Sequence, residues 1–335
     1  MRALRVHRHG EPAEVLIVEE IEPLRPGPGQ VAIAVGGAAL NLPDLLLCRG
    51  TYALHPPLPF TPGLDVAGTV VELGAGVDDA ILGQVVAGVA ELPHGALAEG
   101  SILAADRLYP VPAGLDPGAA AAMLIAYTTA HVSLFRRGRL VPGETLLVLG
   151  AAGGVGTAAI QVGRLAGARV LAAAGSAEKV RTCLALGADE AIDTSVADLT
   201  DTVLGLTRGR GVDVVFDPVG GTAFDAARKC TASEGRLLVI GFAGGVQHVA
   251  ANLVLYRNQS VVGVYLGAYS KDPVGRAFMQ GVWSDIIDWY GTGRIVPVID
   301  RTIGLEAVAT ALTDLADRRV TGKIVVIPAA PPNLT

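Results

Sequence analysis

The sequence predicts an α/β fold in which a doubly wound, six-stranded parallel sheet is inserted into a second, mainly β domain. Residues 1–120 are rich in short β-type runs separated by proline and glycine clusters, which indicates a β domain. From residue 145 onward the chain alternates apolar runs with helix-compatible segments, which is typical of a parallel sheet. After residue 276 this alternation gives way to two helical segments and a closing strand. The sheet-bearing domain is therefore expected to lie between two parts of the other domain.

The first domain is expected to contain several strands and one helix. Asp116 is a good N-cap and Pro117 a favourable first-turn residue, so a helix is expected to begin at these residues and to run through residues 119–134. The expected strands cover residues 3–6, 15–19, 30–35, a long run after the turn at 62–63, and 85–89.

The middle segment is expected to form a complete doubly wound sheet, because it contains six strand-like runs. The expected strands are residues 145–149, 169–173, 190–192, 212–216, 236–240 and 260–264, with helices at 155–165, 177–186, 196–206 and 222–229. Strands covered on both faces are continuously apolar, which accounts for the mean hydropathy of +0.47. The tail adds helices at 276–290 and 306–315 and a strand at 323–327.

The composition indicates a soluble, intracellular protein. No window offers the roughly 18 or more uninterrupted apolar residues of a membrane helix, and the amino terminus has no apolar signal region. The three cysteines, Cys48, Cys183 and Cys230, are far apart, which fits a reducing compartment such as the cytoplasm. A formal net charge of −6, with no long basic cluster, argues against nucleic acid as a partner.

A glycine-rich turn at residues 150–156 lies between the first strand and the first helix of the expected parallel sheet. Glycine residues let the backbone approach a pyrophosphate closely, and the helix N-terminus offers free N–H groups and a positive dipole end. The strand before the turn and the helix after it supply the context that a lone glycine pattern lacks. The turn therefore predicts a dinucleotide phosphate site.

The end of the second strand favours NADP(H) over NAD(H). In this fold an acidic residue about 20 positions past the glycines binds the ribose 2′-hydroxyl, but Gly175 and Ser176 stand there instead and Lys179 follows. A hydroxyl, backbone N–H groups and a cation suit a 2′-phosphate, which a carboxylate would repel. The alternative is that Lys179 is a solvated helix residue.

Several motifs together carry a family resemblance over residues 1–328. They are residues 41–44 (NLPD), 63–68 (GLDVAG), 151–156 (AAGGVG), 175–179 (GSAEK), 217–221 (DPVGG), 235–245, 252–253 and 321–323 (TGK). With these motifs the chain resembles the zinc-free NADPH:quinone oxidoreductases (zeta-crystallin type) of the medium-chain dehydrogenase/reductase superfamily. Residues 263–269 resemble the quinone oxidoreductase-like protein 2 branch. The resemblance implies a GroES-like catalytic domain at 1–122, a Rossmann domain at 123–263 and the remainder of the catalytic domain at 264–335.

The resemblance also implies roles for individual residues. NADPH would meet Ala152, Gly153, Gly154, Val155 and Gly156 at its pyrophosphate, Gly175, Ser176 and Lys179 at its 2′-phosphate, and Val219, Gly241, Phe242, Ala243, Tyr265 and Leu266 around its ribose and nicotinamide. Asn41 and Thr128 would lie near the nicotinamide and the substrate, and Tyr52 would close the pocket. A homodimer is implied as well, formed by pairing of residues 260–264 across a two-fold axis.

No metal site is expected. Asn41 and Leu64 stand where the related zinc alcohol dehydrogenases have a cysteine and a histidine ligand, and the three scattered cysteines cannot build a zinc lobe. Because no Lewis acid would then stabilise an alkoxide, the sequence disfavours simple alcohol oxidation.

Reduction of a small hydrophobic quinone is the expected reaction. Asn41 could polarise a quinone oxygen through its amide, and Thr128 or Tyr52 through a hydroxyl. The structural alternatives are that Asn41 holds a turn, Thr128 satisfies a helix carbonyl and Tyr52 packs, while Asp44 is expected to brace the loop as an acceptor. Reduction of an activated C=C bond, with Tyr52 as proton donor, is the alternative reaction. A non-catalytic NADPH-binding or structural protein is the third possibility.

Overall fold

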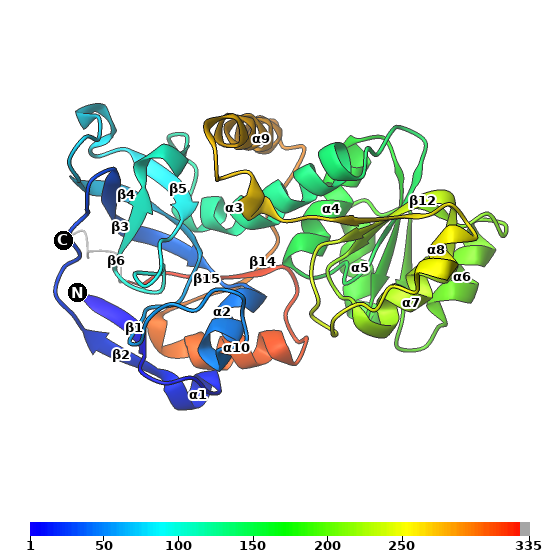
Figure 1. The fold of residues 1–335 in the computed structure, drawn as a ribbon, viewed down its shortest axis with the longest axis horizontal. Coiled ribbons are helices and arrows are strands. Elements are labelled where there is room, and N and C mark those ends of the chain that lie inside the picture. The colour runs from blue at the N-terminus through cyan, green and yellow to red at the C-terminus, as the bar shows by residue number, and fades with distance from the viewer. Residues whose placement is uncertain (329–335) are drawn as a thin grey trace. The chain divides into compact units, whose positions relative to one another are not determined.

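The computed structural model describes residues 1–328 and divides into two compact units (Figure 1). Within the described chain, the first unit comprises Met1–Ile125 and residues 297–328, and the second comprises Ala126–Val296. Residues 264–296 belong to the second unit, where the Val296 carbonyl accepts a hydrogen bond from Tyr127 Oη at 2.8 Å. The family resemblance implies domain boundaries after residues 122 and 263. These boundaries stay a prediction.

The second unit contains the expected six-stranded parallel sheet, so this prediction is confirmed. Its strand order is β10-β9-β8-β11-β12-β13, and every neighbouring pair is parallel. The strands are β8 (Thr145–Val148), β9 (Arg169–Ala174), β10 (Glu190–Asp193), β11 (Val212–Asp217), β12 (Thr231–Val239) and β13 (Ser260–Gly263). The order reverses between β8 and β11, and ligands of such sheets bind at the carboxyl ends of the strands beside this point.

Helices cover both faces of this sheet. A Cβ on Gly163 of α4 (Gly154–Leu165) would lie 2.5 Å from the Leu146 side chain, so α4 packs tightly on one face of β8. Leu147 faces the other way and shares a core cluster with Val203 of α6 (Leu199–Leu206) and Phe224 of α7 (Gly221–Lys229). The other helices of this unit are α5 (Ala177–Ala185), α8 (Ala251–Leu255) and α9 (Pro273–Gly291), with a short turn η4 (Leu266–Ala268). Two covered faces explain why the strands are apolar on both sides.

The first unit is mainly β, as the sequence predicts. A seven-stranded mixed sheet has the order β14-β15-β3-β4-β5-β7, with β6 paired to β3, and β1 pairs separately with β2. The strands are β1 (Arg2–Val6), β2 (Leu16–Glu20), β3 (Gln30–Ala39), β4 (Asp65–Leu73), β5 (Val85–Val89), β6 (Gly100–Ala104), β7 (Tyr109–Pro110), β14 (Ile299–Ile303) and β15 (Lys323–Val326). The helices are α1 (Pro12–Val15), α2 (Leu42–Arg49) and α10 (Val308–Ala316), with short turns η1 (Asp79–Ile81), η2 (Ala105–Arg107) and η5 (Leu305–Ala307).

Three local predictions were incomplete. Val15 ends helix α1 instead of starting a strand, because Pro12 begins a helical turn there. Helix α2 was not foreseen, although Asn41 and Asp44 stand in the N-cap and N3 positions of a capping box. The helix expected from Pro117 through residue 134 begins there as α3 (Pro117–His131), but it then continues as a π-helix, η3 (Val132–Arg137), which extends beyond the expected end.

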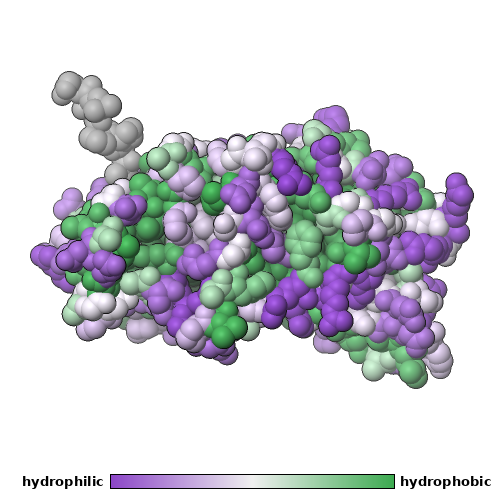
Figure 2. All heavy atoms as spheres, turned by 90° about the horizontal axis from the view of Figure 1, so that it is seen from above, coloured by the Kyte–Doolittle hydropathy of each residue, from purple (hydrophilic) through white to green (hydrophobic). Residues whose placement is uncertain are grey.

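One helical segment is long and apolar enough to cross a membrane by composition, namely Pro117–Arg137. Its most apolar window is 89% buried inside the structure, as in the core helix of a globular protein. On the face shown in Figure 2, hydrophilic and hydrophobic side chains are interspersed. The cytoplasmic location expected from the sequence stays a prediction.

Candidate active site

The glycine-rich turn leads from β8 into α4 with little room for side chains. Gly150 adopts a left-handed conformation with φ +55°. The carbonyl oxygen of Gly150 accepts a hydrogen bond from the Gly153 amide at 2.9 Å. A Cβ on Gly156 would lie 2.4 Å from that same carbonyl oxygen, so glycine is required there. Within residues 1–328, three consecutive backbone amides have no protein acceptor, namely those of Gly154, Val155 and Gly156. The first turn of α4 therefore presents three free N–H groups, which fits an anion such as a pyrophosphate.

The second strand ends in a loop that also leads into a helix N-terminus. Ser176 is the N-cap of α5, and its hydroxyl accepts from the Lys179 amide at 3.3 Å. Its O–H proton remains available for a further acceptor, since a hydroxyl both donates and accepts. Gly175 is exposed, with open space where a Cβ would be. A hydroxyl, a helix N-terminus and a lysine in one turn fit a phosphate group.

A third loop is fixed by the buried carboxylate of Asp217 at the end of β11. One carboxylate oxygen accepts from the amides of Val219 and Gly220, both at 2.8 Å. Burial raises the pKa of Asp217, and these two amides oppose the shift. The Val219 carbonyl accepts from the Gly244 amide at 2.6 Å, which holds the loops after β11 and β12 together. Val219 and residues 241–244 therefore lie next to each other at the carboxyl edge of the sheet.

The remaining cofactor-side residues project outward. Phe242 is 48% exposed and Tyr265 is 65% exposed, while Ala243 is also exposed and Leu266 opens the short turn η4. The structure thus brings the predicted residues of the loops after β8, β9, β11 and β12 to the carboxyl edge of one sheet.

The first unit holds a buried charged cluster around Asn41. Lys323 of β15 is 6% exposed, and its Nζ donates to Asn41 Oδ1 at 2.6 Å and to Asp65 Oδ2 at 3.2 Å. Asp65 is fully buried and also accepts from Asn41 Nδ2 at 2.9 Å and from the Ile125 amide at 3.1 Å. Burial raises the pKa of Asp65, and the charge of Lys323 is the largest opposing effect. We call Asn41, Asp65 and Lys323 the buried cluster.

In this arrangement the side chain of Asn41, which was expected to donate to a substrate, is engaged within the first unit, as in the alternative that Asn41 holds a turn. One amide hydrogen bonds the Ala39 carbonyl at 3.1 Å and the other bonds Asp65, while the amide oxygen accepts from Lys323. The backbone N–H of Asn41 donates to Asp44 Oδ2 at 2.7 Å in the capping box. Asn41 therefore holds the start of α2, and Asp44 braces it as expected.

Tyr52 and Thr128 lie in different units. Tyr52 is partly buried and packs against the hydrophobic core of the first unit. Thr128 is 2% exposed on α3 and belongs to the second unit. Their roles toward a substrate stay predictions.

The sequence interpretation missed Lys323 and Asp65 as site residues. Each is a charged residue at the start of a strand, β15 and β4, and is followed by apolar residues. A charge inside a buried strand must be paired, so the two residues could have been matched on that ground. Among residues 1–328, no group of three or more His, Cys, Asp or Glu side chains could hold a metal ion.

Comparisons with known proteins agree with this architecture. Residues 27–132 match the alcohol dehydrogenase GroES-like domain family, and residues 154–282 match the zinc-binding dehydrogenase family. The chain belongs to the medium-chain dehydrogenase/reductase superfamily, in the group of zinc-free quinone oxidoreductases. It is 37% identical to quinone oxidoreductase-like protein 2 of Rattus norvegicus over 92% of this chain and 88% of that protein.

Two solved structures extend the similarity to the whole fold. Quinone oxidoreductase of Pseudomonas syringae pv. Tomato is 30% identical, with a TM-score of 0.90 over 98% of this chain and 99% of that one. The Escherichia coli quinone oxidoreductase complexed with NADPH is 26% identical, with a TM-score of 0.89 over 98% and 100% of the two chains.

Asp44 gives a pH-dependent prediction for stability. Its carboxyl group is fully buried, and burial raises its pKa from 3.8 to about 7. Between these values the folded protein keeps a proton that the unfolded chain has released. The free energy of unfolding of the wild type, compared with that of Asp44→Asn, should therefore fall as pH rises from about 4 to about 7, by up to about 1.4 kcal/mol per pH unit.

Urea denaturation of both proteins across this pH range, followed by circular dichroism, measures the difference. Asp79→Asn, which makes the same substitution at an exposed aspartate of the same unit, is the matched control. A flat difference between the wild type and Asp44→Asn would show that Asp44 titrates alike in the folded and unfolded chain.

Proposed function

We propose that the chain is an NADPH-dependent reductase that delivers hydride to a small hydrophobic quinone. The observation that carries the cofactor assignment is the pair of anion-binding turns at the carboxyl edge of the sheet. Gly154, Val155 and Gly156 offer free amides for the pyrophosphate, and Ser176 with Lys179 offers a hydroxyl and a cation for the 2′-phosphate. The Escherichia coli relative, whose structure holds NADPH, supports the same assignment.

The bound cofactor supplies hydride transfer, and this chain supplies binding, orientation and exclusion of water. A quinone that takes up one hydride and one proton becomes a hydroquinone, so the reaction consumes one proton per turnover. Tyr52 and Thr128 are the proposed hydroxyl donors to the quinone oxygens. Asn41 has both amide hydrogens engaged within the first unit. Asn41 acts as a positioning residue that fixes the start of α2.

The names of the relatives support a quinone as substrate, including quinone oxidoreductase of Rattus norvegicus at 32% identity. We also propose a cytoplasmic homodimer that pairs through β13. This strand is the last of its sheet and bonds only to β12 within the described chain, so its other edge is open. Light scattering that gives a monomer mass would contradict the dimer.

A panel of acceptors tests the reaction. NADPH oxidation is followed with an ortho-quinone, a para-quinone, an alkenal and an enoyl thioester, and kcat/KM is compared. The quinones should give the highest values because their oxygens accept reducing equivalents without a metal ion. Activity on the alkenes alone would replace the proposal by C=C reduction. Binding of NADPH without oxidation by any acceptor would replace it by a non-catalytic role.

Lys179 gives a separate prediction for the cofactor. Lys179→Ala should raise the KM for NADPH about tenfold or more and leave the KM for NADH within about twofold, because only NADPH carries the 2′-phosphate. Lys271→Ala removes an exposed cation from the same unit and serves as the matched control. Equal effects on both cofactors would mean that Lys179 does not contact the 2′-phosphate.

A further inference from the structure

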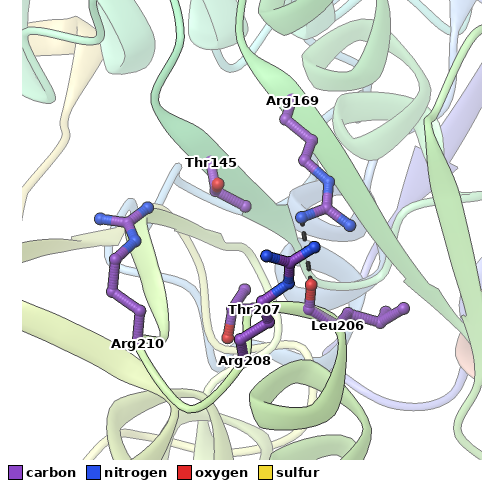
Figure 3. Close-up of a pocket in the computed structure, with 6 residues that line it drawn as sticks. All are labelled: Thr145, Arg169, Leu206, Thr207, Arg208 and Arg210. Atoms are coloured by element: carbon purple, nitrogen blue, oxygen red, sulfur yellow. Dashed lines mark hydrogen bonds between the residues drawn. The ribbon is translucent and has the colours of Figure 1, made fainter.

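A basic pocket lies in the second unit, away from the glycine-rich turn. It has a volume of about 290 Å³ and is lined by Thr145, Arg169, Leu206, Thr207, Arg208 and Arg210 (Figure 3). These residues come from the starts of β8 and β9 and from the turn between α6 and β11. We call this cavity the arginine pocket.

The arginine pocket is separate from the candidate cofactor site. Thr145 begins β8, whereas the glycine-rich turn starts at Gly150, after the strand has ended. At about 3.3 Å per residue, roughly 16 Å of extended chain separate these two positions. The pocket therefore lies at the amino edge of the sheet, while the predicted NADPH residues lie at its carboxyl edge.

Two guanidinium groups enter the pocket without a full set of acceptors. Arg169 donates to the Leu206 carbonyl at 3.1 Å and lies 3.8 Å from a carboxylate oxygen of Glu190. The Arg208 guanidinium is exposed and has no acceptor in the described part of the chain. Figure 3 shows both groups extending toward each other from opposite sides of the pocket. Like charges placed in this way repel unless an anion lies between them.

The third arginine is already neutralised. Arg210 makes a two-pronged ion pair with Asp213, with N–O distances of 2.6 and 2.7 Å. Three arginines against Glu190 and Asp213 leave a net charge of +1 around the pocket. The unneutralised charge therefore belongs to the side of the pocket that Arg169 and Arg208 share.

The turn that carries Arg208 is held by several hydrogen bonds. Arg208 has a left-handed φ of +53°, which is rare for a residue with a side chain. Thr207 braces the turn, because its hydroxyl donates to the Val203 carbonyl at 2.7 Å and accepts from the Gly211 amide at 3.0 Å. The Gly209 amide also donates to the Leu204 carbonyl at 2.7 Å. A ligand that Arg208 binds would thus have little backbone to order.

We propose that the arginine pocket binds the phosphate group of a small phosphorylated molecule, at a site distinct from the cofactor site. The planar guanidinium fork matches phosphate oxygens, and Arg169 and Arg208 can each supply N–H donors to one phosphate. The volume lies at the lower end of ligand pockets, so it suits a phosphomonoester and is too small for a dinucleotide. Free inorganic phosphate shares this chemistry and is distinguished below.

Calorimetric titration of the NADPH-saturated protein tests the proposal, with inorganic phosphate and glycerol 3-phosphate as probes at constant ionic strength. Bound NADPH occupies the proposed 2′-phosphate site and so prevents the probes from binding there. A parallel titration of Lys179→Ala shows whether any of the measured binding depends on that site. Arg208→Gln and Arg169→Gln should each weaken probe binding about tenfold or more. Arg294→Gln removes an exposed cation from the same unit outside the pocket and should leave binding unchanged.

The outcomes separate the sources of phosphate. Tighter binding of glycerol 3-phosphate than of inorganic phosphate identifies a phosphorylated metabolite as the ligand class, and equal binding identifies free phosphate. Arg208 is exposed, so its variant tests binding without a change in the core. The proposal is overturned if Arg208→Gln binds both probes as the wild type does, or if neither probe binds at millimolar concentration. Phosphate binding is measured without turnover, so a failure of the probes to bind does not contradict the proposed reductase function. Likewise, a failure of the acceptors to oxidise NADPH does not contradict phosphate binding at the arginine pocket.

Discussion

The ion pair between Lys323 and Asp65 is the constraint on which the first unit depends. Both charged groups are almost fully removed from water, and a buried charge is tolerated only when it is paired and hydrogen-bonded. The pair meets this condition because Asn41 and the Ile125 amide satisfy the remaining oxygen atoms. The cluster thereby joins β15 from the end of the chain to β4, to the start of α2 and to α3. These segments cannot separate without exposing one unpaired charge to the apolar interior.

The second unit depends on backbone geometry instead of buried charge. Its site is made by strand ends, where tight turns leave amide groups without protein acceptors. Gly156 is needed because a side chain would strike the Gly150 carbonyl, and Asp217 holds the next loop through two backbone amides. A preorganised set of amides binds an anion without further rearrangement, which is what a reusable redox cofactor requires. The two units thus contribute different things: the second a set of anion-binding amides, and the first a fixed polar cluster.

The sequence predicted the parallel sheet well because the signals for it are local. Apolar runs and the glycine-rich turn mark each strand within a few residues, and the structure has all six. The capping box of α2 was also local, and it was overlooked as a helix signal. The Asn41–Lys323 contact could not be predicted in the same way, because it joins residues 282 positions apart. The family resemblance implied that Asn41 donates to a substrate, and the structure shows that neighbouring groups use both of its amide hydrogens.

A double-mutant cycle on Lys323→Met and Asp65→Asn tests most directly whether the buried ion pair holds the first unit together. Both tryptophans, Trp283 and Trp289, lie in the second unit, so native-state hydrogen exchange of the β3 and β4 amides is the appropriate measure. Each single substitution should lower the free energy of opening by about 3–5 kcal/mol, because it leaves one buried charge unpaired. The double substitution should cost less than the sum, with an interaction energy of about 2 kcal/mol or more. Strictly additive effects would show that Lys323 and Asp65 do not depend on each other and would contradict the account.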